Sequence, residues 1–131
     1  MVVGFGMAMV VPPSLLVIDD EVGIRQSLID IFKQEGVKHI REAESAEEGF
    51  KKLEEEPFSL IICDYRLPGM TGIAFMGKLR MKGDQTPLLI ITGVPNKDLV
   101  MHAANALKVG FLAKPFTITD LMVAVENLMS L

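Results

Sequence analysis

The sequence predicts an α/β domain in which an open parallel β-sheet carries helices on both faces. Short apolar runs alternate along the chain with segments whose apolar residues have helical spacing, five times in all. Such alternation is typical of a parallel sheet with crossover helices. The apolar runs are nearly continuous, as expected for strands buried on both faces. The length of 131 residues fits one domain.

The first repeat is an apolar run followed by an amphipathic segment. Ser14–Ile18 is the run, and it predicts the first strand. Val22–Glu35 has apolar residues at helical spacing, and Gly36 ends this helix because glycine is favoured just past a helix C-terminus. Val37–Ala43 is predicted as the second strand.

Capping and turn residues mark the next two repeats. Ser45 as N-cap, with Glu48 three residues later, is the pattern of a capping box and predicts the start of the second helix. Ser59–Cys63 is predicted as the third strand, Arg66–Gly69 as a loop and Gly72–Met81 as the third helix.

The last two repeats follow the same order. Pro87–Ile91 is predicted as the fourth strand, Asn96–Leu107 as the fourth helix and Gly110–Ala113 as the fifth strand. Thr117 as N-cap, with Asp120 at the third helical position, predicts a last helix that runs to the C-terminus.

Composition and charge exclude several classes of protein. The chain has 13 Lys and Arg against 17 Asp and Glu, for a net charge of −4, which argues against non-specific nucleic-acid binding. The single cysteine, Cys63, excludes an internal disulfide framework and a cysteine-rich metal site. A reducing, cytoplasmic location is the simplest interpretation.

The N-terminal segment is apolar but lacks the features of a targeting signal. Met1–Val11 has no basic residues and no small-residue cleavage site, and Pro12 and Pro13 interrupt it. It is shorter than the roughly 20 residues that cross a bilayer. We interpret residues 1–13 as an extension that is flexible or packed on the surface, ahead of a domain over 14–131. We expect no membrane insertion; an extension that lies on a membrane is the alternative.

Residues suited to phosphate and metal chemistry follow four of the five predicted strands. They are Asp19 with Asp20, Asp64, Thr92 and Lys114. In open α/β sheets, ligands bind outside the carboxyl ends of the strands. Three close carboxylates repel one another, and a hard cation such as Mg²⁺ relieves that repulsion. Lys114 and Thr92 would then face an anionic ligand.

Four motifs at these strand ends resemble the receiver domain of two-component response regulators, over residues 14–131. The motifs are Leu15–Glu21, Ile61–Gly72, Ile91–Gly93 and Ala113–Phe116. The resemblance implies a flavodoxin-like, doubly wound five-stranded (β/α)5 sheet of order 2-1-3-4-5.

The resemblance also assigns roles at the acidic cluster. Asp64 is implied to be the phosphoacceptor, which receives a phosphoryl group from a sensor histidine kinase or a phosphotransfer protein. Asp20, Asp64 and the backbone carbonyl of Arg66 are implied to hold Mg²⁺ or Mn²⁺ directly, and Asp19 to act through metal-bound water. Asp20 can alternatively serve only as a helix cap.

Other residues are implied to sense the phosphoryl group. Thr92, Gly93 and Lys114 would bind it, and Phe111 would be an aromatic switch whose ring turns inward as Thr92 moves. A plain core role is the alternative for Phe111. Arg66 and Val94 flank the entry of the attacking water in this family. We hypothesise that they obstruct hydrolysis and so tune the lifetime of the phosphoryl group.

The expected output is a protein surface, since no DNA-binding segment follows the last helix. We predict that helix four, strand five and helix five form a face for a downstream protein or a second copy of the chain, with no direct nucleic-acid contact. In the last helix, Leu121, Val125 and Leu128 would form the core stripe and leave Met122 and Met129 on an adjoining face. The alternative is that this face is only less polar than the rest of the surface and binds no partner.

Three functions compete. The first is a phosphorylatable switch that is not an enzyme, except in assisting its own phosphorylation and dephosphorylation. The second is an inactive receiver kept as an interaction module. The third is a phosphohydrolase like those of the haloacid-dehalogenase family, which needs an Asp-x-Asp motif that Asp19–Glu21 does not supply.

Overall fold

The core of the molecule is a five-stranded parallel sheet. The computed structural model describes residues 2–3, 7–8, 11–93 and 108–130. The strands of this sheet are β3 (Ser14–Ile18), β4 (His39–Ala43), β5 (Leu60–Asp64), β8 (Leu88–Thr92) and β9 (Val109–Ala113). Their order is β4-β3-β5-β8-β9, which is 2-1-3-4-5 when these strands alone are counted. The expected order is therefore confirmed.

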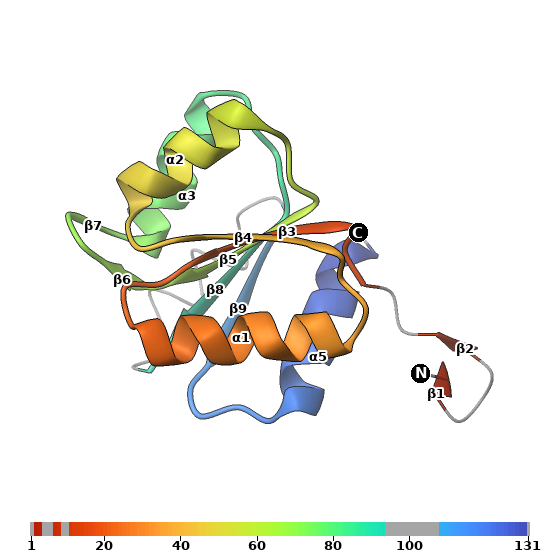
Figure 1. Cartoon of the computed structure of the whole chain (residues 1–131). Helices are drawn as coiled ribbons and strands as arrows, with labels where there is room; N and C mark the ends of the chain where they lie inside the picture. Colours follow the sequence, from red (N-terminus) through yellow and green to blue (C-terminus); the bar gives the residue numbers. More distant parts are fainter. Residues whose placement is uncertain (1, 4–6, 9–10, 94–107, 131) are drawn as a thin grey trace.

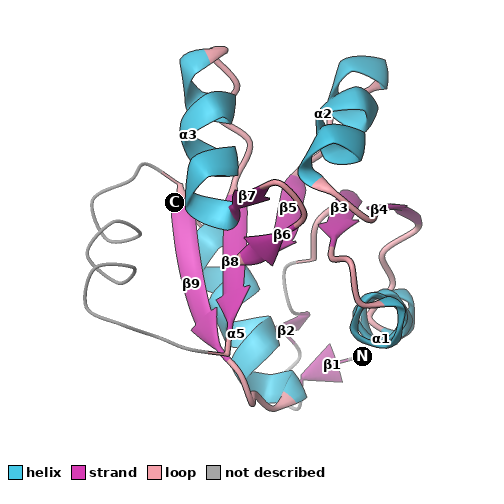
Figure 2. Ribbon diagram, turned by 90° about the vertical axis from the view of Figure 1, so that its left-hand side faces the viewer, coloured by secondary structure: helices cyan, strands magenta, loops and turns pink. Residues whose placement is uncertain are grey.

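Helices cover both faces of the sheet, as predicted. They are α1 (Val22–Gln34), α2 (Ala46–Glu55), α3 (Gly72–Met81) and α5 (Ile118–Met129). Helices α1 and α5 lie on one face and α2 and α3 on the other (Figures 1 and 2). The helix predicted over 96–107 lies outside the described residues.

The central strands are buried on both faces, so their side chains alternate between two hydrophobic layers. In β3, Leu15 and Val17 pack into the layer of α1 and α5, while Leu16 and Ile18 pack into the layer of α2 and α3. The same alternation holds in β5 and β8. This double burial explains why the strands are continuous apolar runs in the sequence.

The second strand starts two residues later than predicted, at His39 rather than Val37. The N–H of Gly36 donates to the carbonyl of Lys33 (3.1 Å), and that of Val37 donates to the carbonyl of Phe32 (3.0 Å). These bonds form a Schellman motif, with Gly36 at φ +97°. Val37 is apolar and buried because it completes this helix end, and not because it is in the sheet.

The loop predicted at Arg66–Gly69 is part of a small hairpin. Strands β6 (Arg66–Leu67) and β7 (Met70–Thr71) pair in antiparallel fashion between β5 and α3. Near the N-terminus, β1 (Val2–Val3) and β2 (Met7–Ala8) form a separate two-stranded antiparallel sheet. None of the helices among the described residues is long and apolar enough to cross a membrane.

The face prediction for the last helix is partly wrong. Leu121, Val125 and Leu128 are buried in the core as expected. Met122, however, is only 3 % exposed and belongs to the same core layer, and Met129 is half-buried against it. The large apolar side chains that α5 exposes are instead Ile118, at 54 %, and Val123, at 49 %. The capping box of Thr117 and Asp120 is formed as predicted.

Candidate functional site

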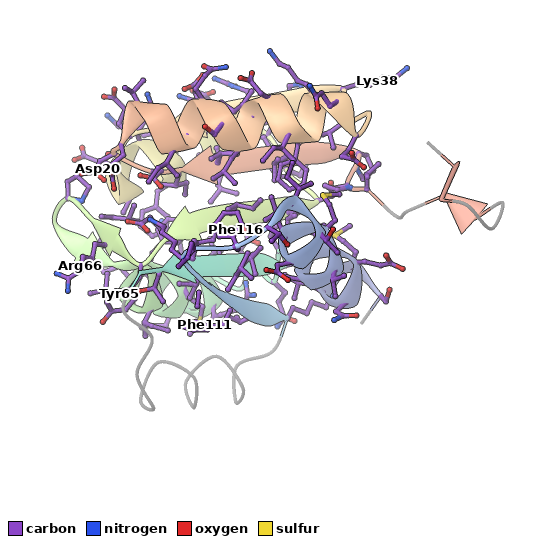
Figure 3. All side chains as sticks on the ribbon, turned by 90° about the horizontal axis from the view of Figure 1, so that it is seen from below. Asp20, Lys38, Tyr65, Arg66, Phe111 and Phe116 are labelled. Atoms are coloured by element: carbon purple, nitrogen blue, oxygen red, sulfur yellow. The ribbon has the colours of Figure 1, made fainter. Side chains whose placement is uncertain are left out.

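The strand register brings the predicted site residues to one edge of the sheet. Ile18 pairs with Cys63, so the residues that follow β3 lie beside Asp64 at the end of β5. Thr92, the last residue of β8, pairs with Ala113, the residue before Lys114. These positions converge because parallel strands end at the same edge. Asp20 and Arg66 lie at this end of the molecule, and Lys38 lies at the opposite end (Figure 3).

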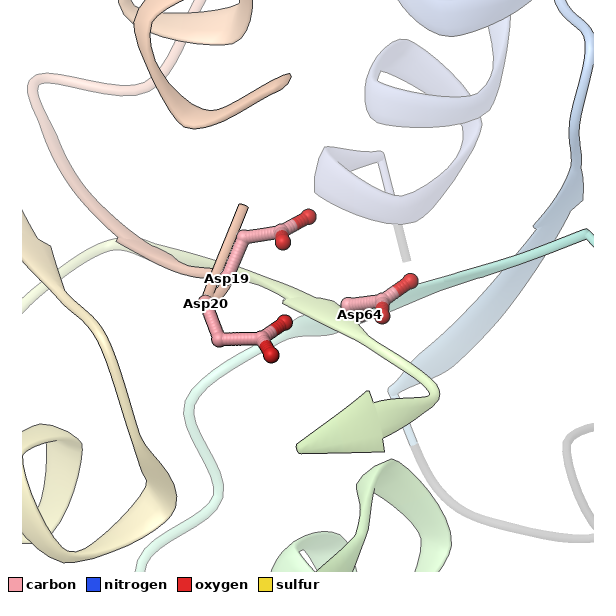
Figure 4. Close-up of side chains that lie close together, drawn as sticks. All are labelled: Asp19, Asp20 and Asp64. Atoms are coloured by element: carbon pink, nitrogen blue, oxygen red, sulfur yellow. The ribbon is translucent and has the colours of Figure 1, made fainter. Parts of the chain in front are cut away.

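Three carboxylates form the centre of the site. Asp19, Asp20 and Asp64 each place an oxygen within 4.8 Å of the others (Figure 4). Asp19 and Asp64 are buried, whereas Asp20 is exposed. Burial raises the pKa of Asp19 from 3.8 to about 6; the N–H of Glu21 opposes this shift, and the charge of Asp64 adds to it. Clustered carboxylate oxygens open to solvent on one side are the donor set of a hard divalent cation, so the residues fit Mg²⁺.

Lys114 supplies a positive charge that pairs directly with Asp64. Its Nζ donates to Oδ1 of Asp64 at 2.9 Å, and its side chain is 23 % exposed. Its backbone N–H donates to the carbonyl of Thr92 at 2.7 Å, which ties the ends of β8 and β9 together. The Lys114–Pro115 peptide bond is cis.

A cleft of about 440 Å³ opens above these groups. Its lining residues are Asp20, Glu21, Asp64, Arg66, Thr92, Gly93 and Lys114. Six of these seven were predicted as site residues; Glu21 was not singled out. Arg66, from β6, stands at the rim and is exposed, while Thr92 is buried at the base.

Among the predicted site residues that the structure describes, Phe111 and Asp19 do not line this cleft. Phe111 is half-buried in β9, packs against the core layer of α2 and α3, and lines a separate groove beside α5. Val94 lies outside the described residues. Asp19 does not line the cleft, but it belongs to the carboxylate cluster beneath.

Sequence reasoning missed the role of Gly72 next to the site. A Cβ at Gly72 would lie 3.0 Å from the backbone carbonyl oxygen of Asp64 and 3.3 Å from Cα of Tyr65. The N–H of Gly72 donates to the carbonyl of Tyr65 at 2.6 Å. The signal in the sequence was a glycine directly after Thr71, which is the N-cap of α3.

A doubly wound α/β domain with three carboxylates, a lysine and a threonine at the carboxyl edge of its sheet defines a class of signalling domains that accept a phosphoryl group. The chain belongs to the response regulator receiver domain family, whose family model matches residues 15–126. The resemblance stated from the motifs is thereby confirmed.

Individual relatives agree with this assignment. The chain is 36 % identical over 114 residues to the probable chemotaxis protein CheY of Rhizobium etli, covering 86 % of this chain and 88 % of that protein. It is 32 % identical over 116 residues to the transcriptional regulatory protein PdtaR of Mycobacterium tuberculosis, covering 88 % of this chain and 56 % of that protein. The chain therefore spans about half the length of that second relative.

A solved structure has the same fold. The beryllofluoride-activated NtrC4 receiver domain dimer superposes with a TM-score of 0.79 at 28 % identity, covering 90 % of this chain and 97 % of that one. The structural match covers nine-tenths of this chain, and the family model spans the residues that line the cleft.

Proposed function

We propose that this receiver accepts a phosphoryl group on Asp64 from a sensor histidine kinase or a phosphotransfer protein, in a reaction that needs Mg²⁺ or Mn²⁺. The observation that carries the proposal is the pairing of Asp64 with Lys114 in a cleft that Asp20 also lines, with Asp19 close by. A carboxylate held only for structure needs no second and third carboxylate beside it.

The chemistry follows from the positions of these groups. A bond forms between a carboxylate oxygen of Asp64 and phosphorus, and the bond from phosphorus to the donor nitrogen breaks. Asp20, Asp64 and the backbone carbonyl of Arg66 would hold the metal, and Asp19 would act through water. When bound, the metal offsets the negative charge of the phosphoryl group. Lys114 stays close enough to pair with that group, and Thr92 and Gly93 line the wall beside it.

Arg66 is the residue that we propose to tune the lifetime of the phosphoryl group, together with Val94. Arg66 is exposed and lines the same cleft as Asp64. Its long side chain would obstruct the water that hydrolyses the acyl phosphate.

The output surface is proposed to include β9 and α5. A groove of about 500 Å³ runs between them, and Phe111 and Val123 line it. Phe111 lies three residues before Lys114 on the same strand, so a change at the phosphorylated site can reach the groove through β9. A downstream protein or a second copy of the chain would bind there, in a cytoplasmic setting. The NtrC4 receiver forms a dimer.

The experiment is phosphorylation by acetyl phosphate, read by intact mass. The wild-type protein should gain one phosphoryl group in the presence of Mg²⁺ and none in EDTA, and Asp64→Asn should gain none. Asp30→Asn is the matched control, because Asp30 is an exposed carboxylate on α1 that accepts a hydrogen bond from Gln26 and lies outside the carboxylate cluster.

Each outcome decides between the candidate functions. Loss of the adduct in Asp64→Asn and its retention in Asp30→Asn support the switch. No adduct on a folded wild-type protein would contradict it and favour the inactive interaction module. Sustained release of phosphate from added phosphate esters would favour the phosphohydrolase.

A further inference from the structure

The loop between β3 and α1 carries two of the three site carboxylates but is not held by a conventional helix cap. Glu21 is the N-cap residue of α1, and its side chain makes no capping hydrogen bond. Ser45, Thr71 and Thr117 do cap the helices that follow them. The side chain of Asp19 accepts the N–H of Glu21 at 2.9 Å, which holds the Asp19 carboxylate. The peptide that joins Asp19 to Asp20 is held by a further group.

Arg25, one turn into α1, makes the contacts that such a group needs. Its side chain is 7 % exposed. Its Nη1 donates to the backbone carbonyl of Asp19 at 2.7 Å, and its Nε donates to Oε1 of Glu42 on β4 at 2.6 Å. Its Nη2 lies 3.6 Å from Oε1 of Glu44. A buried guanidinium is thus paired with a carboxylate on one side and a site backbone group on the other.

The carbonyl that Arg25 contacts belongs to the peptide that joins the two acidic residues. Because this peptide unit is planar, a donor that fixes the carbonyl of Asp19 also fixes the N–Cα bond of Asp20. The N–H of Asp19 is fixed as well, since it donates to the carbonyl of Ala43 at the end of β4 at 3.0 Å. Both ends of Asp19 are therefore anchored on β4, one directly and one through Arg25 and Glu42.

We propose that Arg25 is a positioning residue for the metal site, which clamps the Asp19–Asp20 peptide to the end of β4 so that both carboxylates converge on Asp64. The inference deepens the proposed function, because it rests on metal binding at these carboxylates. Arg25 touches neither the metal nor the phosphoryl group in this role.

Arginine suits this role better than lysine. Its planar fork offers several donors in fixed directions, so it can hold Glu42 and the Asp19 carbonyl at the same time. A lysine at position 25 keeps the charge but offers one ammonium to two acceptors that the guanidinium contacts through different nitrogens. We therefore expect Arg25→Lys to recover part of the function that Arg25→Met loses.

The test is Mg²⁺ titration of the metal-free protein by calorimetry, with no phosphoryl donor present. Arg25→Met should bind Mg²⁺ about tenfold more weakly than wild type, which is the low end of losses seen when outer-shell groups are removed. Arg25→Lys should fall between the two. Arg80→Met is the matched control: Arg80 is also partly buried and donates to backbone carbonyls, of Asp84 and Lys108, but lies outside the carboxylate cluster.

A second measurement reports on the loop itself. Amide exchange of Glu21, whose N–H donates to Oδ1 of Asp19 at 2.9 Å, should be faster in Arg25→Met than in wild type or Arg80→Met. Unchanged Mg²⁺ affinity together with unchanged exchange at Glu21 would overturn the proposal, as would an equal loss of affinity in Arg80→Met.

Two other results, an Arg25→Met variant that does not fold and a wild-type protein that binds no Mg²⁺, can be told apart from a failure of the proposal. If Arg25→Met does not fold, Glu42→Ala replaces it: Glu42 is half-exposed, and losing it leaves the guanidinium without its anchor. Glu42→Ala should weaken Mg²⁺ binding less than Arg25→Met, and unchanged affinity with unchanged Glu21 exchange would overturn the proposal. If the wild-type protein binds no Mg²⁺, the proposed function fails, and the exchange of Glu21 alone decides whether Arg25 positions the loop.

Discussion

Folding opposes the ionisation of the carboxyl group of Asp19. It is 2 % exposed, and burial raises its pKa from 3.8 to about 6. Between these pH values the folded protein binds more protons than the unfolded chain, so the free energy of unfolding falls as pH rises. The stabilising contribution is fully present below about pH 4 and is lost as pH rises through about 6.

We therefore predict that Asp19→Asn stabilises the metal-free protein at pH 7.5. The free energy of unfolding of this variant should also decline less between pH 4 and pH 6 than that of the wild type. Urea unfolding in EDTA at several pH values measures both. Asp30→Asn should leave the decline as it is in wild type, because Asp30 is exposed and apart from the cluster. A decline of equal slope in wild type and Asp19→Asn would contradict the prediction.

Individual site residues were predictable where the chemistry of the residue type was distinctive. Asp19, Asp64 and Lys114 were recognisable because charged groups directly after apolar runs are unusual. Arg25 was not, because an arginine within an amphipathic helix reads as a solvated charge. Only its long-range contacts with Glu42 and the Asp19 carbonyl reveal that it is buried.

At the scale of elements, α3 approaches the end of β5 so closely that a side chain at its first residue, Gly72, would press on the backbone of Asp64 and Tyr65. Gly72→Ala would place a Cβ 3.0 Å from the Asp64 carbonyl oxygen, and a backbone atom cannot move aside at low cost. We predict a destabilisation of about 1–3 kcal/mol, as is typical of overpacking. A smaller yield of phosphorylated Asp64 should accompany it.

Gly77 on the same helix is the matched control. A Cβ there meets nothing within 4 Å, so Gly77→Ala should be neutral or stabilising by up to about 1 kcal/mol through reduced chain entropy. Urea unfolding of the two variants measures the difference. Equal stability of Gly72→Ala and wild type would show that the helix can shift away from β5.

In other elements, the spacing of apolar residues predicted roughly where an element lies but not always which of its side chains face the core. Five consecutive apolar residues, 121–125, lie in α5, so the spacing cannot tell whether Met122 or Val123 faces the core. Packing against the sheet decides for Met122. The hairpin of β6 and β7 was not predictable for a related reason, since strands of two residues have no measurable period.

For the whole molecule, the sheet connects the cleft with the groove that we propose as the output surface. Its carboxyl edge holds the cleft, and its last strand, β9, lies between Lys114 and the groove at α5. The order of strands was predictable because four motifs matched one family. A partner face at the fifth strand and the last helix was expected from the sequence and stays a prediction. The side chains that line its groove, Phe111 among them, depend on packing and were not predictable.

A change at Asp64 should therefore affect β9 more strongly than the far edge of the sheet. We predict that beryllofluoride with Mg²⁺ alters amide exchange in β9 and α5 more than in β4 and α2.

Lys114 is the link, because it pairs with Asp64 through its side chain and with Thr92 through its backbone. Lys114→Met removes only the side-chain link, so it should abolish the response in β9 and α5 while Mg²⁺ still binds. Exchange mass spectrometry with and without beryllofluoride measures this. An equal change in β4 and β9, or a response that survives in Lys114→Met, would mean that the signal leaves the cleft by another route.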